Sequence, residues 1–247
     1  YKGRVKLPGP LAALNAPVEG LLKLADAVTG KMMWFLIIAG VVLSCMHQSS
    51  LGSLMLIAPT KLHPLWYTPI LPLLFLTSAI AVGYPMVVFE TTLATSSLKL
   101  NHEMEILTPL SRFTVFLLGL YLALKVGDMV VRGTYVYLLD GTAQTNAFLV
   151  EMLLGVIVPW VMLVLPKIRH SRSGLFIASA LIVGGVLVNR VNVFVVGYRP
   201  PISEANYAPA FSEILITVGL IAGLMFLYRF LVTYLPVLNR PQQEVSA

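Results

Sequence analysis

The sequence predicts an all-α fold, a polytopic transmembrane helix bundle. Of the 247 residues, 57% are hydrophobic and 11% are charged, and the mean hydropathy is +0.85, a balance that soluble domains do not reach. The apolar residues form runs of about 20, the length that crosses a bilayer as a helix. Lys and Arg fall in the gaps between these runs, so the net charge of +6 indicates basic loops at a membrane surface, and nucleic acid is excluded as a partner.

Six runs are long enough to cross the membrane. They cover approximately residues 32 to 51, 69 to 91, 110 to 131, 147 to 165, 174 to 196 and 210 to 235. The third reaches membrane length only by including Lys125 and Asp128, and the fourth only by including Glu151. Residues 1–31 are expected to be a cytoplasmic segment, with a short interfacial amphipathic helix or a solvated linker around residues 18–28. Residues 236–247 are expected to be a cytoplasmic tail.

The distribution of basic residues predicts the orientation. Lys and Arg concentrate in the N-terminal segment, in the loops between spans two and three and between spans four and five, and in the C-terminal tail. The positive-inside rule places that side in the cytoplasm. Both ends of the chain are then cytoplasmic, and the loops 52–68, 132–146 and 197–209 face outward.

The cysteine and histidine positions limit the cofactors. A single cysteine, Cys45, excludes both a disulfide framework and an iron–sulfur cluster held by this chain. A bis-histidine haem needs two facing histidines inside the membrane, yet only His47 lies in a span, while His63, His102 and His170 fall in loops or at helix ends. No haem is predicted, so a redox role requires an attached subunit that delivers or collects electrons.

Polar residues gather near the outer ends of five spans. They are His47, Gln48, Lys125, Asp128, Glu151, Asn189, Arg190, Asn192 and Glu213. A polar layer is costly inside a membrane and typically lines a pathway or a substrate pocket. Single residues have structural alternatives: Lys125 and Asp128 at i, i+3 could neutralise each other, Arg190 could pair with Glu151, and an acid in a first helical turn is favoured by the helix dipole.

The layer suits a lipid-soluble substrate whose head group takes up protons, as a quinone does. His47 is expected to hydrogen-bond a carbonyl oxygen and transfer a proton, and Glu151 or Asp128 is expected to serve its protons. Arg190 is expected to hold that acid ionised. His47, Asp128 and Glu151 are therefore the candidate catalytic residues.

Three runs carry a family resemblance: MHQSSLGSLMLIAPTKLHPLWYTPILPLLFLTSAIAVGYPMVVFE, EMLLGVIVPWVML and VLVNRVNVFVVG. They resemble the NrfD, or polysulfide-reductase membrane-subunit, family, in particular its Ni/Fe-hydrogenase-2 type (HybB-like). Similar proteins are haem-free subunits that exchange electrons between menaquinone or ubiquinone and a periplasmic iron–sulfur subunit, which serves a catalytic subunit. The resemblance implies quinone binding by His47, Gln48, Glu151, Asn189 and Arg190. Relatives have about eight to ten spans, so it also implies that this chain is the later part of such a subunit.

The sequence thus predicts a quinone-reactive subunit of a respiratory complex in the bacterial inner membrane, surrounded by lipid. A hydrogenase-type assembly is favoured over one with a multihaem cytochrome. The partner is expected on the outer loops 58–68 and 197–209, at Trp66, Tyr67, Tyr198 and Tyr207, unless these aromatic residues form an ordinary interfacial belt. The alternatives are a secondary transporter, which should show internal repeats and helices broken at mid-membrane, and a purely structural anchor.

Overall fold

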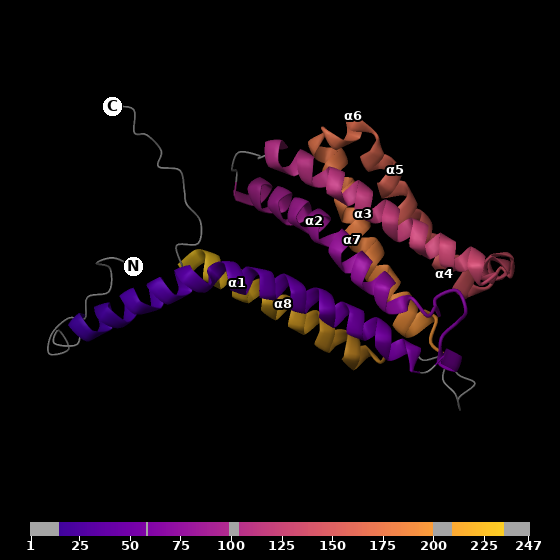
Figure 1. Ribbon diagram of the computed structural model, residues 1–247, viewed down its shortest axis with the longest axis horizontal. Coiled ribbons are helices and arrows are strands. Elements are labelled where there is room, and N and C mark those ends of the chain that lie inside the picture. Colours follow the sequence, from indigo (N-terminus) through magenta and orange to yellow (C-terminus); the bar gives the residue numbers. More distant parts are fainter. Residues whose placement is uncertain (1–14, 58, 99–103, 200–208, 235–247) are drawn as a thin grey trace. The chain divides into compact units, whose positions relative to one another are not determined.

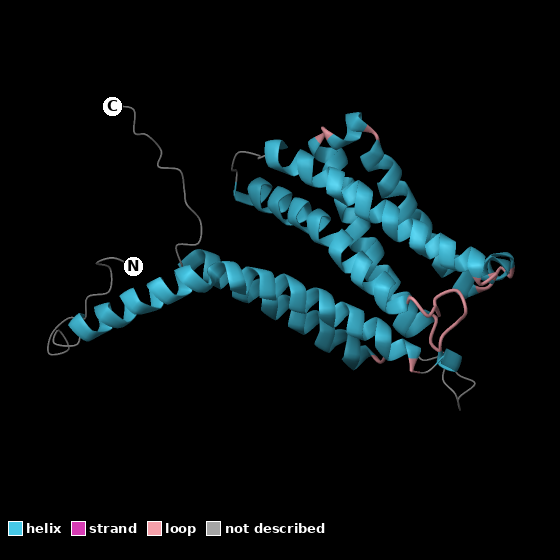
Figure 2. Cartoon of the chain, in the orientation of Figure 1, coloured by secondary structure: helices cyan, strands magenta, loops and turns pink. Residues whose placement is uncertain are grey.

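The computed structural model describes residues 15–57, 59–98, 104–199 and 209–234, and in these ranges the regular elements are helices (Figures 1 and 2). Six helices there are long and apolar enough to cross a membrane: Ala16–Leu56, Leu71–Ser96, Leu107–Val131, Ala143–Val164, Arg172–Val196 and Phe211–Leu231. The predicted all-α transmembrane bundle with six spans is confirmed.

The long helices are α1 (Asn15–Leu56), α2 (Leu71–Leu98), α3 (Met104–Val131), α7 (Arg172–Val191) and α8 (Phe211–Tyr234). The fourth span is composite, with α4 (Ala143–Met152), the π-helical turn η4 (Leu153–Ile157) and α5 (Val158–Val164) in succession. Short elements complete the order: η2 (Pro59–Lys61), η3 (Thr134–Leu139), α6 (Pro166–Arg169) and the π-helical turn η5 (Asn192–Val196), which extends α7. Helix α8 belongs to a second compact unit, residues 202–247, and is described by itself.

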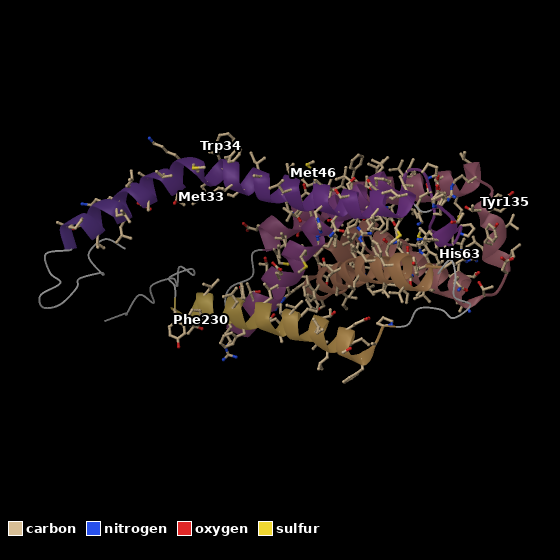
Figure 3. All side chains as sticks on the ribbon, turned by 90° about the horizontal axis from the view of Figure 1, so that it is seen from below. Met33, Trp34, Met46, His63, Tyr135 and Phe230 are labelled. Atoms are coloured by element: carbon tan, nitrogen blue, oxygen red, sulfur yellow. The ribbon has the colours of Figure 1, made fainter. Side chains whose placement is uncertain are left out.

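Helix α1 is longer than the predicted first span. It runs through 42 residues without interruption, so the expected separate element at residues 18–28 is part of the same helix. The reason is the lack of a helix breaker: Pro17 lies in the first turn, where a proline is tolerated, and no further proline follows before Leu56. Its exposed apolar side chains, among them Trp34 and Met46, stand out from the helix in Figure 3.

In the unit formed by residues 1–201, α2 packs against α1, α3 and α7 (Figure 1). Close approach of the backbones depends on glycine at two places. A Cβ atom on Gly52 of α1 would lie 2.9 Å from the Cα atom of Pro72, and one on Gly155 would lie 2.6 Å from the Cα atom of Gly185. These contacts set how far α1 and α7 are rotated, and thus which side chains they turn inward.

The loop that joins α1 to α2 folds back into the bundle. His63 N–H donates to Gly197 O at 2.8 Å, Arg199 N–H donates to Lys61 O at 2.7 Å, and Leu62 and Tyr198 form an isolated antiparallel bridge. We call residues 57–70 the anchored loop. The pairing draws its middle inward, and Trp66 has an exposed fraction of 0%.

The fourth span and the fifth span, formed by α7 and η5, each contain a π-helical turn at a polar residue of the predicted layer. Turn η4 follows Glu151 and Met152 directly, and turn η5 begins at Asn192. Pro159 comes just after η4, where the widened turn accommodates a ring that cannot donate a backbone N–H. Such turns are frequent at functional sites because they redirect the side chains around them.

Candidate functional site

Glu151 is the buried centre of the site, with an exposed fraction of 2%. Its carboxylate accepts three N–H groups from three elements: Trp66 Nε1 of the anchored loop at 2.9 Å, Asn189 Nδ2 of α7 at 2.6 Å and Asn192 Nδ2 of η5 at 2.8 Å. A buried carboxylate is costly unless its oxygens are hydrogen-bonded, and here both oxygens are. Asn192 also donates to Ala147 O at 3.2 Å, which fixes the amide relative to α4.

Arg190 joins three helices beside this carboxylate. Its guanidinium donates to Gln48 Oε1 of α1 at 3.2 Å, to Ser78 Oγ of α2 at 2.8 Å and to Asn189 Oδ1 at 2.6 Å. The guanidinium carbon also lies 3.8 Å from the ring centroid of Phe75, a cation–π contact. The side chain is thereby held in one orientation.

The structural alternative, a direct ion pair between Arg190 and Glu151, is not formed by the described residues. Asn189 lies between them, because its amide oxygen accepts from Arg190 and its amide nitrogen donates to Glu151. An amide can bridge a cation and an anion in this way because it carries both a donor and an acceptor. Hydrogen bonds therefore connect Arg190 to Glu151 through Asn189.

A cavity of about 20 Å³ adjoins the Glu151 carboxylate. Ser78, Tyr121 and Asn189 line it together with apolar side chains and the Gly155–Gly185 contact. This volume has room for one water molecule, with several polar partners around it. The cavity is too small for a quinone head group.

Asp128 forms a second polar cluster nearer the end of α3. Thr68 Oγ1 of the anchored loop donates to Asp128 Oδ1 at 2.8 Å, and Arg132 donates to Oδ2 from Nε at 2.9 Å and from Nη2 at 2.8 Å. Asp128 thus pairs with Arg132 at i+4, so the alternative pairing with Lys125 is wrong. Lys125 is buried, and its ammonium faces the ring of Phe148 at 5.3 Å.

The predicted site residues are brought together in part. Gln48, Glu151, Asn189 and Arg190 form one connected network, and among the described residues Asp128 is linked to it by hydrogen bonds through the anchored loop. His47 precedes Gln48 on α1 but is exposed, and within the described residues no hydrogen bond is formed by its ring. Glu213 lies in the second unit, where its carboxylate accepts from Ala210 N at 3.3 Å.

The aromatic contacts expected on the outer loops need one correction. Trp66 is fully buried and bound to Glu151, so its prediction as a surface contact is wrong. Tyr67 and Tyr198 are half-buried, and Tyr207 lies outside the described residues.

His63 is a buried residue that the sequence does not single out for the site. Leu65 N–H donates to its Nδ1 at 3.3 Å, and its ring meets Trp66 and Tyr137 edge-on, with ring centroids 5.9 and 5.8 Å apart. Burial, and then the positive charge of Arg199, lower the pKa of His63 below its ordinary value of 6.5. The imidazole is therefore neutral near pH 7.

Trp66 and Thr68 are residues of the network that sequence reasoning left out of the site, and Asn192 belongs to the predicted polar layer but not to the expected quinone-binding residues. Asn192 carried a usable signal, because it follows Asn189 at i+3 and thus shares its helix face. Trp66 and Thr68 carried none, because only the pairing of the anchored loop with residues 197–199 brings them inside.

Comparison with known proteins identifies one family. The model of the family described as polysulphide reductase, NrfD, matches residues 8–201. A protein of Nitratidesulfovibrio vulgaris (strain Hildenborough) is 37% identical over 230 residues, covering 89% of this chain and 58% of the relative. The probable Ni/Fe-hydrogenase 2 b-type cytochrome subunit of Escherichia coli K12 is 33% identical over 217 residues, covering 87% of this chain and 55% of the relative.

The chain therefore spans little more than half the length of these two curated relatives. No solved structure matches it.

The name of the Escherichia coli relative refers to a b-type haem, so the described histidines can be tested for one. His63 is enclosed by Trp66 and Tyr137, and its Nδ1 already accepts from Leu65 N. His170 precedes the N-terminal end of α7, whereas the Arg190 network lies near the C-terminal end of that helix. The Nδ1 atom of His170 lies 2.7 Å from Pro166 O. Neither can share a haem with His47, so the described residues do not fit a bis-histidine haem.

Proposed function

Because the chain belongs to the polysulphide reductase NrfD family, we propose that it is the quinone-reactive, haem-free membrane subunit of a respiratory redox complex. One observation carries the proposal. The buried Glu151 carboxylate is held by three N–H donors and is linked through Asn189 to Arg190 and Gln48. Such a network inside a membrane bundle is typical of a proton-handling site.

Menaquinone or ubiquinone is the proposed substrate. Its reduction adds electrons and an equal number of protons, and oxidation of the quinol reverses both transfers. The quinone head group would lie beside α1, where His47 is exposed and Gln48 contacts Arg190, because the cavity at Glu151 admits only a water molecule. His47 would hydrogen-bond a quinone carbonyl oxygen, and Gln48, Asn189 and Arg190 would shape the site.

Two acids are proposed to move the protons. Asp128 lies near the C-terminal end of α3 and is bound by Thr68 of the anchored loop. Glu151 lies in the interior and is bound by Trp66 of the same loop. The water-sized cavity at Glu151 offers a place for a bridging water molecule. The proton would pass between solvent and the quinone oxygen through one or both of these carboxylates.

The electrons are proposed to come from, or go to, a periplasmic iron–sulfur subunit that serves a catalytic subunit of the hydrogenase or multihaem-cytochrome type. This partner would dock at the end of the bundle that carries the anchored loop, with Tyr67 and Tyr198 among its contacts. The opposite end carries the basic residues Lys167, Arg169 and Arg172, which by the positive-inside rule favours a cytoplasmic location in a bacterial inner membrane. Both chain ends would then be cytoplasmic.

The test is purification of the whole complex from its native membrane. We expect a cluster-bearing subunit and bound quinone to co-purify, and electron transfer to a soluble quinone analogue to depend on Glu151. The proposal fails if the purified protein contains no redox partner and instead takes up a solute when it is reconstituted into liposomes.

A further inference from the structure

A groove of about 280 Å³ lies between the C-terminal end of α2 and the N-terminal end of α7. Ser96, Arg172 and Ser173 supply polar groups to it, and Leu93, Phe176 and Ile177 supply an apolar wall. The groove has more than ten times the volume of the cavity of about 20 Å³ beside Glu151. It joins a polar and an apolar part in one site.

Arg172 provides a positive charge at this groove that no acid of the described residues pairs with. Its Nη2 donates to Ser96 Oγ at 2.5 Å, and it forms no ion pair with any acid in the described ranges. Lys167 and Arg169 precede it, and residues 152–203 contain neither Asp nor Glu. Glu90, an acid of α2, does not line the groove. An anion is the ligand that this charge favours.

The apolar wall rests on a stacked pair of rings. Phe89 of α2 and Phe176 of α7 lie 5.3 Å apart with an interplanar angle of 9°. This contact ties the two helices together and leaves Leu93 and Ile177 to border the groove. A long hydrocarbon chain fits such a border, whereas a free inorganic anion gains nothing from it.

The groove lies at the level expected of a membrane surface. Eighteen residues separate Ser78 from Ser96 on α2 and Arg172 from Arg190 on α7. At 1.5 Å per residue the groove is about 27 Å from the Arg190 network along both helices. Because the hydrocarbon core of a bilayer is about 30 Å thick, the two sites lie near opposite boundaries.

We propose that this groove binds an anionic phospholipid. The lipid phosphate would accept hydrogen bonds from Arg172, Ser96 and Ser173, and one acyl chain would follow Leu93, Phe176 and Ile177 into the membrane. Basic pockets between transmembrane helices bind anionic head groups for the same electrostatic reason. The site is independent of the proposed quinone chemistry.

Photo-crosslinking tests the proposal with the full-length protein in nanodiscs. One preparation contains a trace of phosphatidylglycerol with a diazirine on an acyl chain, and the other contains phosphatidylcholine with the same chains. We expect peptides spanning residues 92–96 and 172–177 to be labelled about fivefold more by the anionic lipid, since one basic residue near a membrane contributes about 1 kcal/mol. Arg172→Gln should remove this preference.

Arg112→Gln is the matched control, because Arg112 is an exposed arginine of α3 that does not line the groove. It should leave the labelling unchanged. Equal labelling of the wild-type protein by both lipids overturns the proposal, and this comparison stands even if Arg172→Gln does not fold. A preference that Arg172→Gln retains, or one that millimolar inorganic phosphate abolishes, also overturns a lipid site.

Discussion

The indole N–H of Trp66 donates a 2.9 Å hydrogen bond to Glu151, a residue 85 positions away in the sequence. Two residues after Trp66, Thr68 binds Asp128. One loop therefore holds both candidate proton-carrying acids. The same loop pairs through its backbone with residues 197–199, so hydrogen bonds connect both carboxylates to the end of α7.

Trp66→Phe is predicted to impair the site while keeping most of its packing. The phenyl ring fills much of the indole volume but leaves one Glu151 oxygen with one donor fewer, which should lower the free energy of unfolding by about 1 to 3 kcal/mol. Quinone turnover by the assembled complex should fall. Thermal unfolding in detergent and steady-state turnover measure the two effects.

Trp160→Phe is the control for this prediction. Trp160 Nε1 donates to a backbone carbonyl, Val115 O, at 3.0 Å, and among the described residues its indole N–H is not bonded to the Glu151 network. The Trp160→Phe variant should lose about as much free energy of unfolding as Trp66→Phe, and its complex should keep the wild-type quinone turnover. Equal turnover losses in both variants would show that Trp66 matters for packing alone.

Glu151→Gln is predicted to destabilise the network and to slow turnover. The new amide nitrogen is a donor, and it would face the N–H groups of Trp66, Asn189 or Asn192. We expect a loss of about 1 to 3 kcal/mol and a turnover rate lowered by about 100-fold. Glu90→Gln, at an exposed acid of α2, should change neither quantity. Full turnover by Glu151→Gln would exclude this carboxylate as a proton carrier.

His47→Ala is predicted to separate function from stability. His47 is exposed and makes no hydrogen bond among the described residues, so its removal should change the free energy of unfolding by less than about 0.5 kcal/mol. Quinone turnover should nevertheless fall by about 100-fold. Ser50→Ala, at another exposed polar residue of α1, should be silent in both assays. A wild-type rate in an assembled His47→Ala complex would remove His47 from the proposed chemistry.

Arg190→Gln is predicted to weaken folding more than the other changes. It withdraws donors from Gln48, Ser78 and Asn189 at once. Unpaired buried groups of this kind cost several kcal/mol. A double-mutant cycle with Gln48→Ala should give a coupling energy of about 0.5 to 3 kcal/mol, because the two side chains share a hydrogen bond. Strictly additive effects on the unfolding temperature would contradict this contact.

His63 predicts a pH dependence of stability. Its pKa in the folded protein is below the ordinary 6.5, first through burial and second through Arg199. As the pH falls below about 6.5 the unfolded chain binds a proton that the folded protein does not, so stability decreases until the pH reaches the folded-state pKa. In His63→Gln, the unfolding temperature should depend less on pH below about pH 6.5 than it does in the wild-type protein. An unchanged slope in this variant would assign the effect to another group.

The composition and the spacing of apolar residues predict the helical fold and the six spans, because a helix in lipid satisfies its own backbone and needs little tertiary information. The gathering of Gln48, Glu151, Asn189 and Arg190 also follows from their similar depth. Their connections do not follow from depth. Whether Arg190 reaches Glu151 or stops at Asn189 depends on helix rotation, which is set by contacts such as Gly155 on Gly185.

The burial of Trp66 lies further beyond sequence reasoning. An aromatic residue after a transmembrane span usually marks the membrane surface. Here a backbone bridge between Leu62 and Tyr198, 136 positions apart, pulls it inside, and no local pattern signals that bridge. The apolar spacing likewise does not predict the π-helical turns η4, beside Glu151, and η5, which begins at Asn192.

The arginines at the two ends of α7 have a further consequence. Arg190 donates to Ser78 and Arg172 donates to Ser96, so each arginine meets a serine of α2. The two serines are as far apart on α2 as the two arginines are on the antiparallel α7. A slide of α7 by one helical turn, about 5.4 Å, would break both bonds at once. The two hydrogen-bonded pairs therefore fix the position of α7 along the axis of α2. In a bilayer, contacts between apolar side chains alone define that position poorly.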